Sequence, residues 1–377
     1  MDFDLTKSQK EIQKAAAEFA KGEFDKDLII EHLHRQAFPE KICRKAADLG
    51  FIGINFPEKF EGGGMGLFEY ILVAEQFCKR DSSMGMAVLL SAHGGECLFT
   101  SGENSVSGKY LFKIAVGETR CAAAFFETGF GRKLTHIETT AVKHNGGWCI
   151  NGKKAYVPNG LAADVFFVLC RAESGMSLFA IEANTPGVQV KPSGMQLGER
   201  LTPYADVTFD NVCVPGDFLI GKPSKGLEQA NSFLTLFRVQ LAGIALGTAQ
   251  GALDRALDHV RKRVQFGKKI GQFQVIRHKI AEMAAGIDAA RSLTYLAAWK
   301  SDNRRLDEKT AAAAKLLSCR TAMAVTDEAV QLLGGYGYMT EYEVEHFYRD
   351  AKVLEVMGGT CGELLDIISG PVIGRIK

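Results

Sequence analysis

The sequence has almost no excess charge of either sign, which argues against several classes of partner. Its 45 lysines and arginines nearly balance 44 aspartates and glutamates, leaving a formal net charge of +1. A protein that binds nucleic acid or a membrane surface through bulk charge carries a larger basic excess. We therefore expect neither nucleic acid nor a charged membrane surface as a partner.

Long apolar runs and paired cysteines are also lacking. We see no stretch that approaches the roughly 20 apolar residues needed to cross a bilayer, so we expect no membrane span. The first five residues include two aspartates and no apolar run, which gives no sign of a secretion signal. The nine cysteines are scattered singly, without a CxxC pair, which favours reduced thiols over disulfides or metal ligands. Together these absences predict a cytoplasmic protein without a metal site.

What the sequence does contain is a change of hydrophobic period along the chain. Residues 1–117 have helical spacing, beginning with a capping-box pattern from Thr6 to Gln9. Residues 118–225 have strand patterns, and 148–157 is interpreted as a hairpin that turns at Asn151-Gly152. Residues 226–377 are helical again, and 227–263 could be one helix or two joined end to end.

This order predicts an α+β chain of three closely packed domains. We expect an N-terminal helical domain over 1–117, a middle antiparallel β domain over 118–225 and a C-terminal four-helix bundle over 226–377.

Three motifs then occur in order, and together they resemble the acyl-CoA dehydrogenase family. Residues 209–215, FDNVCVP, resemble that family's exit from its β domain. Residues 263–274, RVQFGKKIGQFQ, resemble its RxxFGxxIxxFQ segment. Residues 331–338, QLLGGYGY, with RDAK at 349–352, resemble its last signature. One glycine-rich match would be weak, but three in the right order and structural class are specific.

The resemblance implies a cofactor and an assembly. Family members bind FAD between two subunits of a tetramer, oxidise an acyl-CoA thioester and pass electrons to an electron-transfer flavoprotein. A pyrophosphate calls for a cation and for backbone that can approach closely, which an arginine and glycines supply. The implied contacts to the FAD of a neighbouring subunit are Arg263, Phe266, Gln274, Gln331, Gly334 and Gly335.

The family's catalytic base is missing from both of its usual positions. The glutamate that precedes the family's GT dipeptide falls on Gly358, beside Gly359-Thr360. The alternative site, just before an arginine in the first bundle helix, falls on Phe237. Gly358 keeps only its backbone N–H, which by resemblance would hold the thioester carbonyl, and Thr360 is an implied flavin contact. Glu355 is nearby, but we expect it to pair with a neighbouring cation.

The half of the FAD site that the family builds from its own β domain is also altered. Phe126 replaces a flavin-binding threonine, Thr128 a proline and Pro158 a second hydroxyl donor. Arg132-Lys133 stands where the family has serine and aspartate. Only this half is eroded, whereas the half offered to a neighbour is intact.

Three functions remain open. The first is an acyl-CoA oxidoreductase with a displaced base, in which the stretch from Ser82 to Glu96 forms the pocket floor and the substrate contacts are Arg238, Arg132 and His93. The second is a non-catalytic partner in a heterotetramer, which completes the FAD site of an active paralogue. The third, a flavin-dependent monooxygenase, has no positive support.

Overall fold

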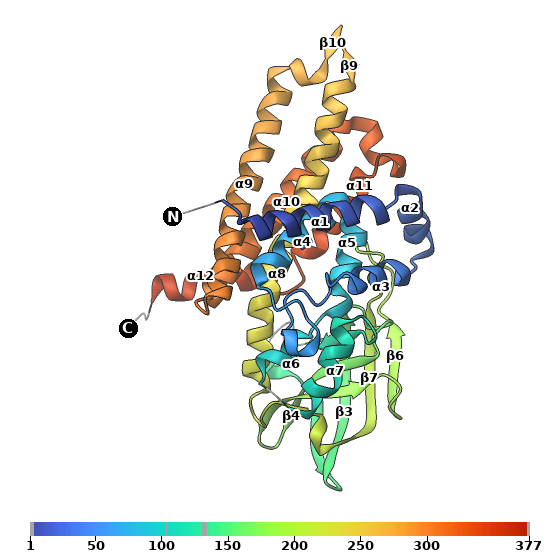
Figure 1. Cartoon of the computed structure of the whole chain (residues 1–377), viewed down its shortest axis with the longest axis vertical. Helices are drawn as coiled ribbons and strands as arrows, with labels where there is room; N and C mark the ends of the chain where they lie inside the picture. The colour runs from blue at the N-terminus through green and yellow to red at the C-terminus, as the bar shows by residue number, and fades with distance from the viewer. Residues whose placement is uncertain (1–3, 103, 130–133, 375–377) are drawn as a thin grey trace.

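The computed structural model describes residues 4–102, 104–129 and 134–374, and it confirms the predicted fold class. Figure 1 shows a β-sheet at one end of the long axis and a long helical bundle at the other. The N-terminal helices pack across the junction between them. Residues of all three parts contribute to one extended hydrophobic core, so the domains are closely packed.

The N-terminal part is helical, as predicted, and begins where the capping box places it. The Thr6 hydroxyl accepts from the Gln9 N–H, and the Gln9 side chain accepts from the Thr6 N–H. The stretch from Ser82 to Glu96 is not one helix: α5 ends at Leu89, a 3₁₀ turn follows to Ala92, and the chain leaves helical geometry at His93, with a ψ of +113°, and at Gly94, with a φ of +99°. The helices are α1 (Lys7–Glu23), α2 (Lys26–Arg35), α3 (Glu40–Asp48), α4 (Leu67–Arg80), α5 (Ser82–Leu89), α6 (Glu96–Thr100) and α7 (Ser105–Ala115).

The middle part forms a sheet with the order β6-β7-β3-β2-β4-β5-β8, and β1 also pairs with β4. Most pairings are antiparallel, but β1 and β2 both run parallel to β4, so the sheet is mixed. Its strands are β1 (Cys121–Ala124), β2 (Thr140–His144), β3 (Gly147–Val157), β4 (Val165–Ala172), β5 (Gly175–Glu182), β6 (Val188–Pro192), β7 (Ala205–Pro215) and β8 (Leu219–Ile220).

The predicted turn at Asn151-Gly152 is wrong. Strand β3 runs straight through these residues, with a shift in its register against β7 between Ile150 and Gly152. The chain instead reverses at Asn145-Gly146, where both residues adopt left-handed φ values, +46° and +79°, as a two-residue hairpin requires. The sequence contains the Asn-Gly dipeptide three times, at 145–146, 151–152 and 159–160, and only the backbone shows that the first of these is the hairpin turn.

The C-terminal part is a bundle built on α8, which is one continuous helix of 37 residues. An 18-residue window of α8 is long and apolar enough to cross a membrane, which corrects the expectation that no stretch approaches that length. The window is 89% buried inside the protein, as befits a core helix. The elements are α8 (Gly226–Lys262), β9 (Val264–Gln265), β10 (Lys268–Lys269), α9 (Gln274–Asp302), α10 (Glu308–Leu333), α11 (Val344–Leu354) and α12 (Cys361–Ile373).

Candidate active site

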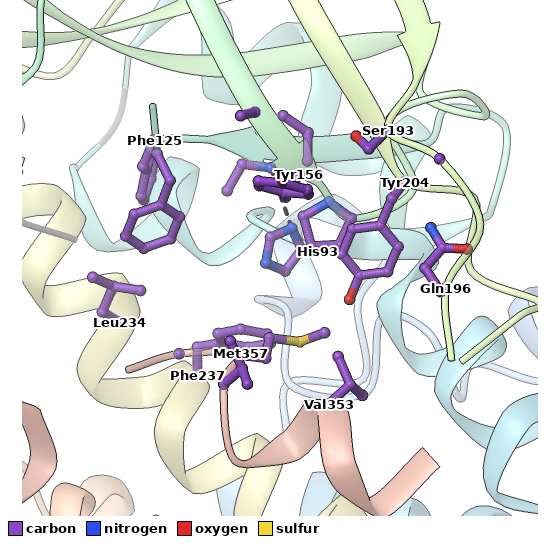
Figure 2. Close-up of a pocket in the computed structure, with 18 of the residues that line it drawn as sticks. His93, Phe125, Tyr156, Ser193, Gln196, Tyr204, Leu234, Phe237, Val353 and Met357 are labelled. Atoms are coloured by element: carbon purple, nitrogen blue, oxygen red, sulfur yellow. Dashed lines mark hydrogen bonds between the residues drawn. The ribbon is translucent and has the colours of Figure 1, made fainter. Parts of the chain in front are cut away.

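A cavity of about 360 Å³ lies where the sheet meets the bundle. The ends of β1 and β3, the loop at 193–196, helix α8 and the turn after α11 form its walls. Figure 2 shows His93, Tyr156 and Tyr204 facing Phe237, Val353 and Met357 across this space. Most of the surrounding side chains are apolar, as is usual for a pocket that binds a small molecule. The lining residues that carry the argument below are His93, Phe126, Tyr156, Pro158, Tyr204, Phe233, Phe237 and Gly358.

His93 is in this cavity, as predicted, but it is a poor base. Its Nδ1 accepts the Ala123 N–H at 3.3 Å, so in the neutral ring the proton is on Nε2. Its ring packs against Phe233 and Phe237, with centroids 5.4 and 4.8 Å away. Burial lowers the pKa of His93 to about 3, and the neutral imidazole can serve as a hydrogen-bond donor.

The two positions at which a base was sought both border the cavity, and neither carries an acid. Phe237 stacks on Phe233 with ring centroids 5.4 Å apart. Gly358 has a φ of +69°, and a Cβ there would lie 2.6 Å from Leu241 Cδ1. Arg238, a predicted substrate contact, donates from Nε to the Gly358 carbonyl at 3.0 Å. This hydrogen bond stabilises the turn at Gly358.

Two nearby glutamates are accounted for by other contacts. Glu355 accepts from Lys352 Nζ at 2.7 Å, which confirms that it pairs with a neighbouring cation. Glu96 is buried and accepts from Gln240 Nε2 at 2.6 Å, so it does not lie on a solvated face.

Phe126 and Pro158, two of the altered positions, lie in the cavity wall. Between them a buried ion pair fixes the ends of the strands, with Lys154 Nζ 2.7 Å from Glu127 Oε1. Burial alone would raise the pKa of Glu127, but the Lys154 charge and hydrogen bonds outweigh it and hold that pKa below its usual value. Thr128 is exposed.

Arg132 and Lys133 lie outside the described residues, so the predicted substrate contact at Arg132 stays a prediction.

A second concave site, a hollow of about 430 Å³, lies on the surface of the bundle, and we call it the cradle. It brings together Arg263, Gln331, Gly334 and Gly335, four of the residues expected to contact FAD. A Cβ at either glycine would meet nothing within 4 Å, so the backbone there is open to a ligand. Gly334 ends α10 at φ +62°, ψ −138°, a conformation restricted to glycine.

The charge of the cradle depends on Arg263. Its guanidinium lies 5.4 Å from the centroid of the Tyr336 ring. The C-terminal end of α10 carries about half a negative charge, which repels anions, so the full positive charge of Arg263 is needed to attract one. The pKa of His259, which also lines the cradle, is lowered by burial and by Arg263, so this histidine adds little positive charge.

The remaining predicted flavin contacts lie outside the cradle. Phe266, at the tip of the β9–β10 hairpin, is 91% exposed, and Gln274 is the exposed first residue of α9. Thr360 caps α12, and its hydroxyl accepts from the Glu363 N–H at 3.3 Å. In one chain, therefore, Phe266 and Gln274 point to solvent and Thr360 has a local structural role.

The cavity and the cradle of one chain are far apart. Helix α8 carries Phe237 at the cavity, and Arg263 follows its last residue. About 26 residues separate the two, or roughly 39 Å of helix at 1.5 Å per residue. The two sites of a single chain therefore cannot face each other.

Sequence analysis missed one polar pair at the cavity. Tyr204 lines the cavity, and its hydroxyl donates to the buried carboxylate of Glu199 at 2.5 Å. The stretch 197–205, LGERLTPYA, contains both residues, but neither belongs to a motif, so no sequence signal marked them.

Comparison with known proteins covers the whole chain. Residues 6–118, 122–212 and 224–371 match the N-terminal, middle and C-terminal domains of acyl-CoA dehydrogenase, respectively. The chain is 34% identical over 372 residues to benzylmalonyl-CoA dehydrogenase of Aromatoleum aromaticum, covering 98% of each chain. It is 32% identical to CarC, a subunit of the caffeyl-CoA reductase–Etf complex of Acetobacterium woodii, covering 98% of this chain and 100% of that one. The structure of butyryl-CoA dehydrogenase from Megasphaera elsdenii superposes with a TM-score of 0.95 at 31% identity, covering 99% and 100%.

Proposed function

The chain belongs to the acyl-CoA dehydrogenase family, and from this premise we propose that it is an FAD-dependent oxidoreductase of an acyl-CoA thioester. The observation that carries the proposal is the composition of the cavity wall. It contains Phe126 and Pro158, at positions expected to contact the flavin, and Phe237 and Gly358, at positions expected to hold the base. We further propose that it works as a homotetramer or heterotetramer with an electron-transfer flavoprotein as redox partner. The relative CarC is named as part of such a complex.

The residues fit FAD if two chains contribute to each site. The cradle of one chain would hold the pyrophosphate through Arg263 and the open backbone at Gly334 and Gly335. The cavity of another chain would receive the ring against Phe126 and Pro158. When bound, FAD supplies hydride transfer to or from the acyl chain.

The chain's own residues would orient the thioester and exclude water. Phe233 and Phe237 form an apolar wall, which strengthens every polar contact made inside the cavity. Arg238 holds the Gly358 turn, and the Gly359 carbonyl accepts from the buried Lys315 at 2.7 Å, which keeps this turn in place. The Gly358 N–H would then hold the thioester carbonyl, as an oxyanion-hole donor does.

A second candidate, the non-catalytic partner subunit, is favoured by the unequal half-sites. Phe126 and Pro158 offer no side-chain hydrogen bond to a flavin, and proline offers no backbone N–H. The cradle, by contrast, retains its arginine, glutamine and glycines. Such a chain would complete a paralogue's site while leaving its own site weak.

Flavin titration with acyl-CoA substrates separates the two functions. The purified chain is saturated with added FAD, and acyl-CoA thioesters of several chemical types are tested for bleaching of the flavin. The reduced protein is tested for reoxidation by enoyl-CoA thioesters. Redox chemistry with any of them supports the oxidoreductase. FAD bound without any redox chemistry, or chemistry only when the paralogue is added, supports the partner role.

A further inference from the structure

We propose that Tyr204 and Glu199 form a proton relay that exchanges the substrate's α proton in place of the missing glutamate. The inference rests on the proposed function, because it assigns a role within the same cavity. Neither residue belongs to a motif discussed above.

Tyr204 connects the cavity to Glu199. Figure 2 shows its ring beside His93 with the hydroxyl pointing toward Val353 and Met357. The hydroxyl donates to Glu199 Oε2 at 2.5 Å, a length typical of a strong hydrogen bond between a hydroxyl and a carboxylate. A proton can therefore pass between the cavity and Glu199 along one short contact.

The surroundings of Glu199 favour a protonated carboxyl group over a carboxylate paired with a cation. Its side chain is fully buried, and its Oε1 has no hydrogen-bond partner among the described residues. Its N–H donates to Asp350 Oδ1 at 2.6 Å, which brings a second carboxyl close. A second carboxyl near a buried one favours a proton on one of the two.

Charged groups near Glu199 are paired with other partners. Arg349 on α11 donates to the Leu197 carbonyl at 3.0 Å, and its Nε pairs with Glu345 at 2.7 Å. His346 on α11 lies 2.8 Å from Asp81 and pairs with that carboxylate instead. Cys78 on α4 is buried, and burial raises its pKa well above the usual value, so it stays neutral. Burial raises the pKa of Glu199 to about 8; the Tyr204 hydrogen bond opposes the rise and the Asp350 charge adds to it.

The proposed step conserves atoms and charge. The substrate's Cα–H bond breaks and its proton forms an O–H bond on Tyr204, while the original Tyr204 proton moves to the Glu199 carboxylate. The enolate is left in the cavity, and the reverse step restores the thioester. Below about pH 8 Glu199 is mainly protonated and donates, and above it Glu199 is mainly ionised and accepts.

The test is exchange of the α hydrogen in D₂O, which requires no electron acceptor. Acyl-CoA that the wild type bleaches is incubated with the FAD-saturated protein, and deuterium uptake is followed by mass spectrometry from pH 6 to pH 10. Tyr204→Phe and Glu199→Gln should each slow exchange by about 10²–10⁴-fold. The wild-type rate should rise toward a plateau above about pH 8, and both variants should lose this rise.

A second tyrosine–glutamate pair provides a matched control. The Tyr110 hydroxyl donates to Glu182 Oε1 at 2.6 Å, away from the cavity. Tyr110→Phe and Glu182→Gln remove the same chemistry and should leave both the exchange rate and its pH profile unchanged.

A separate readout requires neither FAD nor substrate. Infrared spectra of the flavin-free protein between pH 6 and pH 10 should contain a carboxylic acid band that disappears with a midpoint near 8 and is absent in Glu199→Gln. If this band is missing, or if Tyr204→Phe and Glu199→Gln exchange like the wild type, the relay is wrong while the oxidoreductase stands. If the wild type binds FAD but exchanges with no acyl-CoA and shows no redox chemistry with any acyl-CoA or enoyl-CoA, the proposed function fails, and the relay with it, even where the band is present.

Discussion

The cavity and the cradle of one chain differ in their exposure to solvent and in the polar groups that they offer to a ligand. The cavity is walled by aromatic rings, and its lining includes Phe126 and Pro158, the two positions at which the resemblance implies hydroxyl donors. The cradle is open to solvent and contains Arg263 together with Gly334 and Gly335, where an added Cβ would meet no atom within 4 Å. Nearby, Phe266 is 91% exposed, and its ring meets that of Phe273 edge-on with the centroids 6.2 Å apart. The comparison supports the proposal that the cradle serves another subunit and that the cavity of the same chain offers a flavin fewer hydrogen bonds.

Restoring the cavity hydroxyls should give the largest effect. A lost hydrogen bond to a buried polar atom costs about 1–3 kcal/mol, so Phe126→Thr with Pro158→Thr should tighten FAD binding by up to roughly 10⁴-fold. Coupling between the two sites would reduce this figure. Fluorescence titration of the flavin measures it, and Leu161→Thr, on the exposed surface, is the control. Equal FAD affinities for the wild type and the double variant would show that the cavity half-site is not weakened by Phe126 and Pro158.

Supplying a carboxylate tests the cavity's missing base. In a Glu199→Gln background, Phe237→Glu should speed α-hydrogen exchange by about 10²–10⁴-fold, because it places a carboxylate at a helical position facing the substrate. Gly358→Glu should gain less, since left-handed φ costs a residue other than glycine about 1–2 kcal/mol and its Cβ would crowd Leu241. Phe237→Gln controls for lost packing. If Phe237→Glu and Phe237→Gln exchange alike, the missing base is not what limits the reaction.

Removing the charge of the cradle should weaken FAD binding in the assembled protein. A charge-assisted contact contributes about 1.5–3 kcal/mol, so Arg263→Ala should lower the affinity roughly 10- to 150-fold. Arg261→Ala, two residues earlier and exposed, removes the same charge outside the cradle and should change little. Unchanged affinity in Arg263→Ala would make Arg263 an ordinary surface residue.

The smallest effect is expected at the hairpin tip. Phe266→Ala should change the free energy of unfolding by no more than about 0.5 kcal/mol, because its side chain packs on little. The same variant should retain less flavin after assembly. Urea unfolding and the absorbance of bound flavin measure the two quantities, and a large loss of stability would indicate that Phe266 supports its own chain.

The sequence predicted best what is local. The capping box at Thr6 and the helix after residue 226 each depend on short segments, and the motif residues near 263 and 331 lie together in the cradle, while their contact with FAD stays a prediction. The turn at Asn151-Gly152 was wrong because the same dipeptide suits a turn or a strand irregularity. The break before Glu96 was missed although Gly94-Gly95 is itself a signal for the end of a helix.

The cavity could be predicted only in part. His93, Phe126 and Phe237 were identified from their motif positions or from neighbouring segments, and all three line it. Tyr204 and Glu199 are five residues apart, but the contact of Glu199 with Asp350 joins residues 151 apart in the sequence. Such contacts depend on how the sheet packs on α11, which no local pattern encodes.

The number of FAD molecules per chain after gel filtration without added flavin tests the inequality of the two half-sites most directly. The account predicts that the wild-type chain, alone, elutes with clearly less than one FAD per chain, and that Phe126→Thr with Pro158→Thr restores it to about one. A wild-type homo-oligomer that keeps one FAD per chain would contradict the account, since its cavity would then bind flavin as well as its cradle.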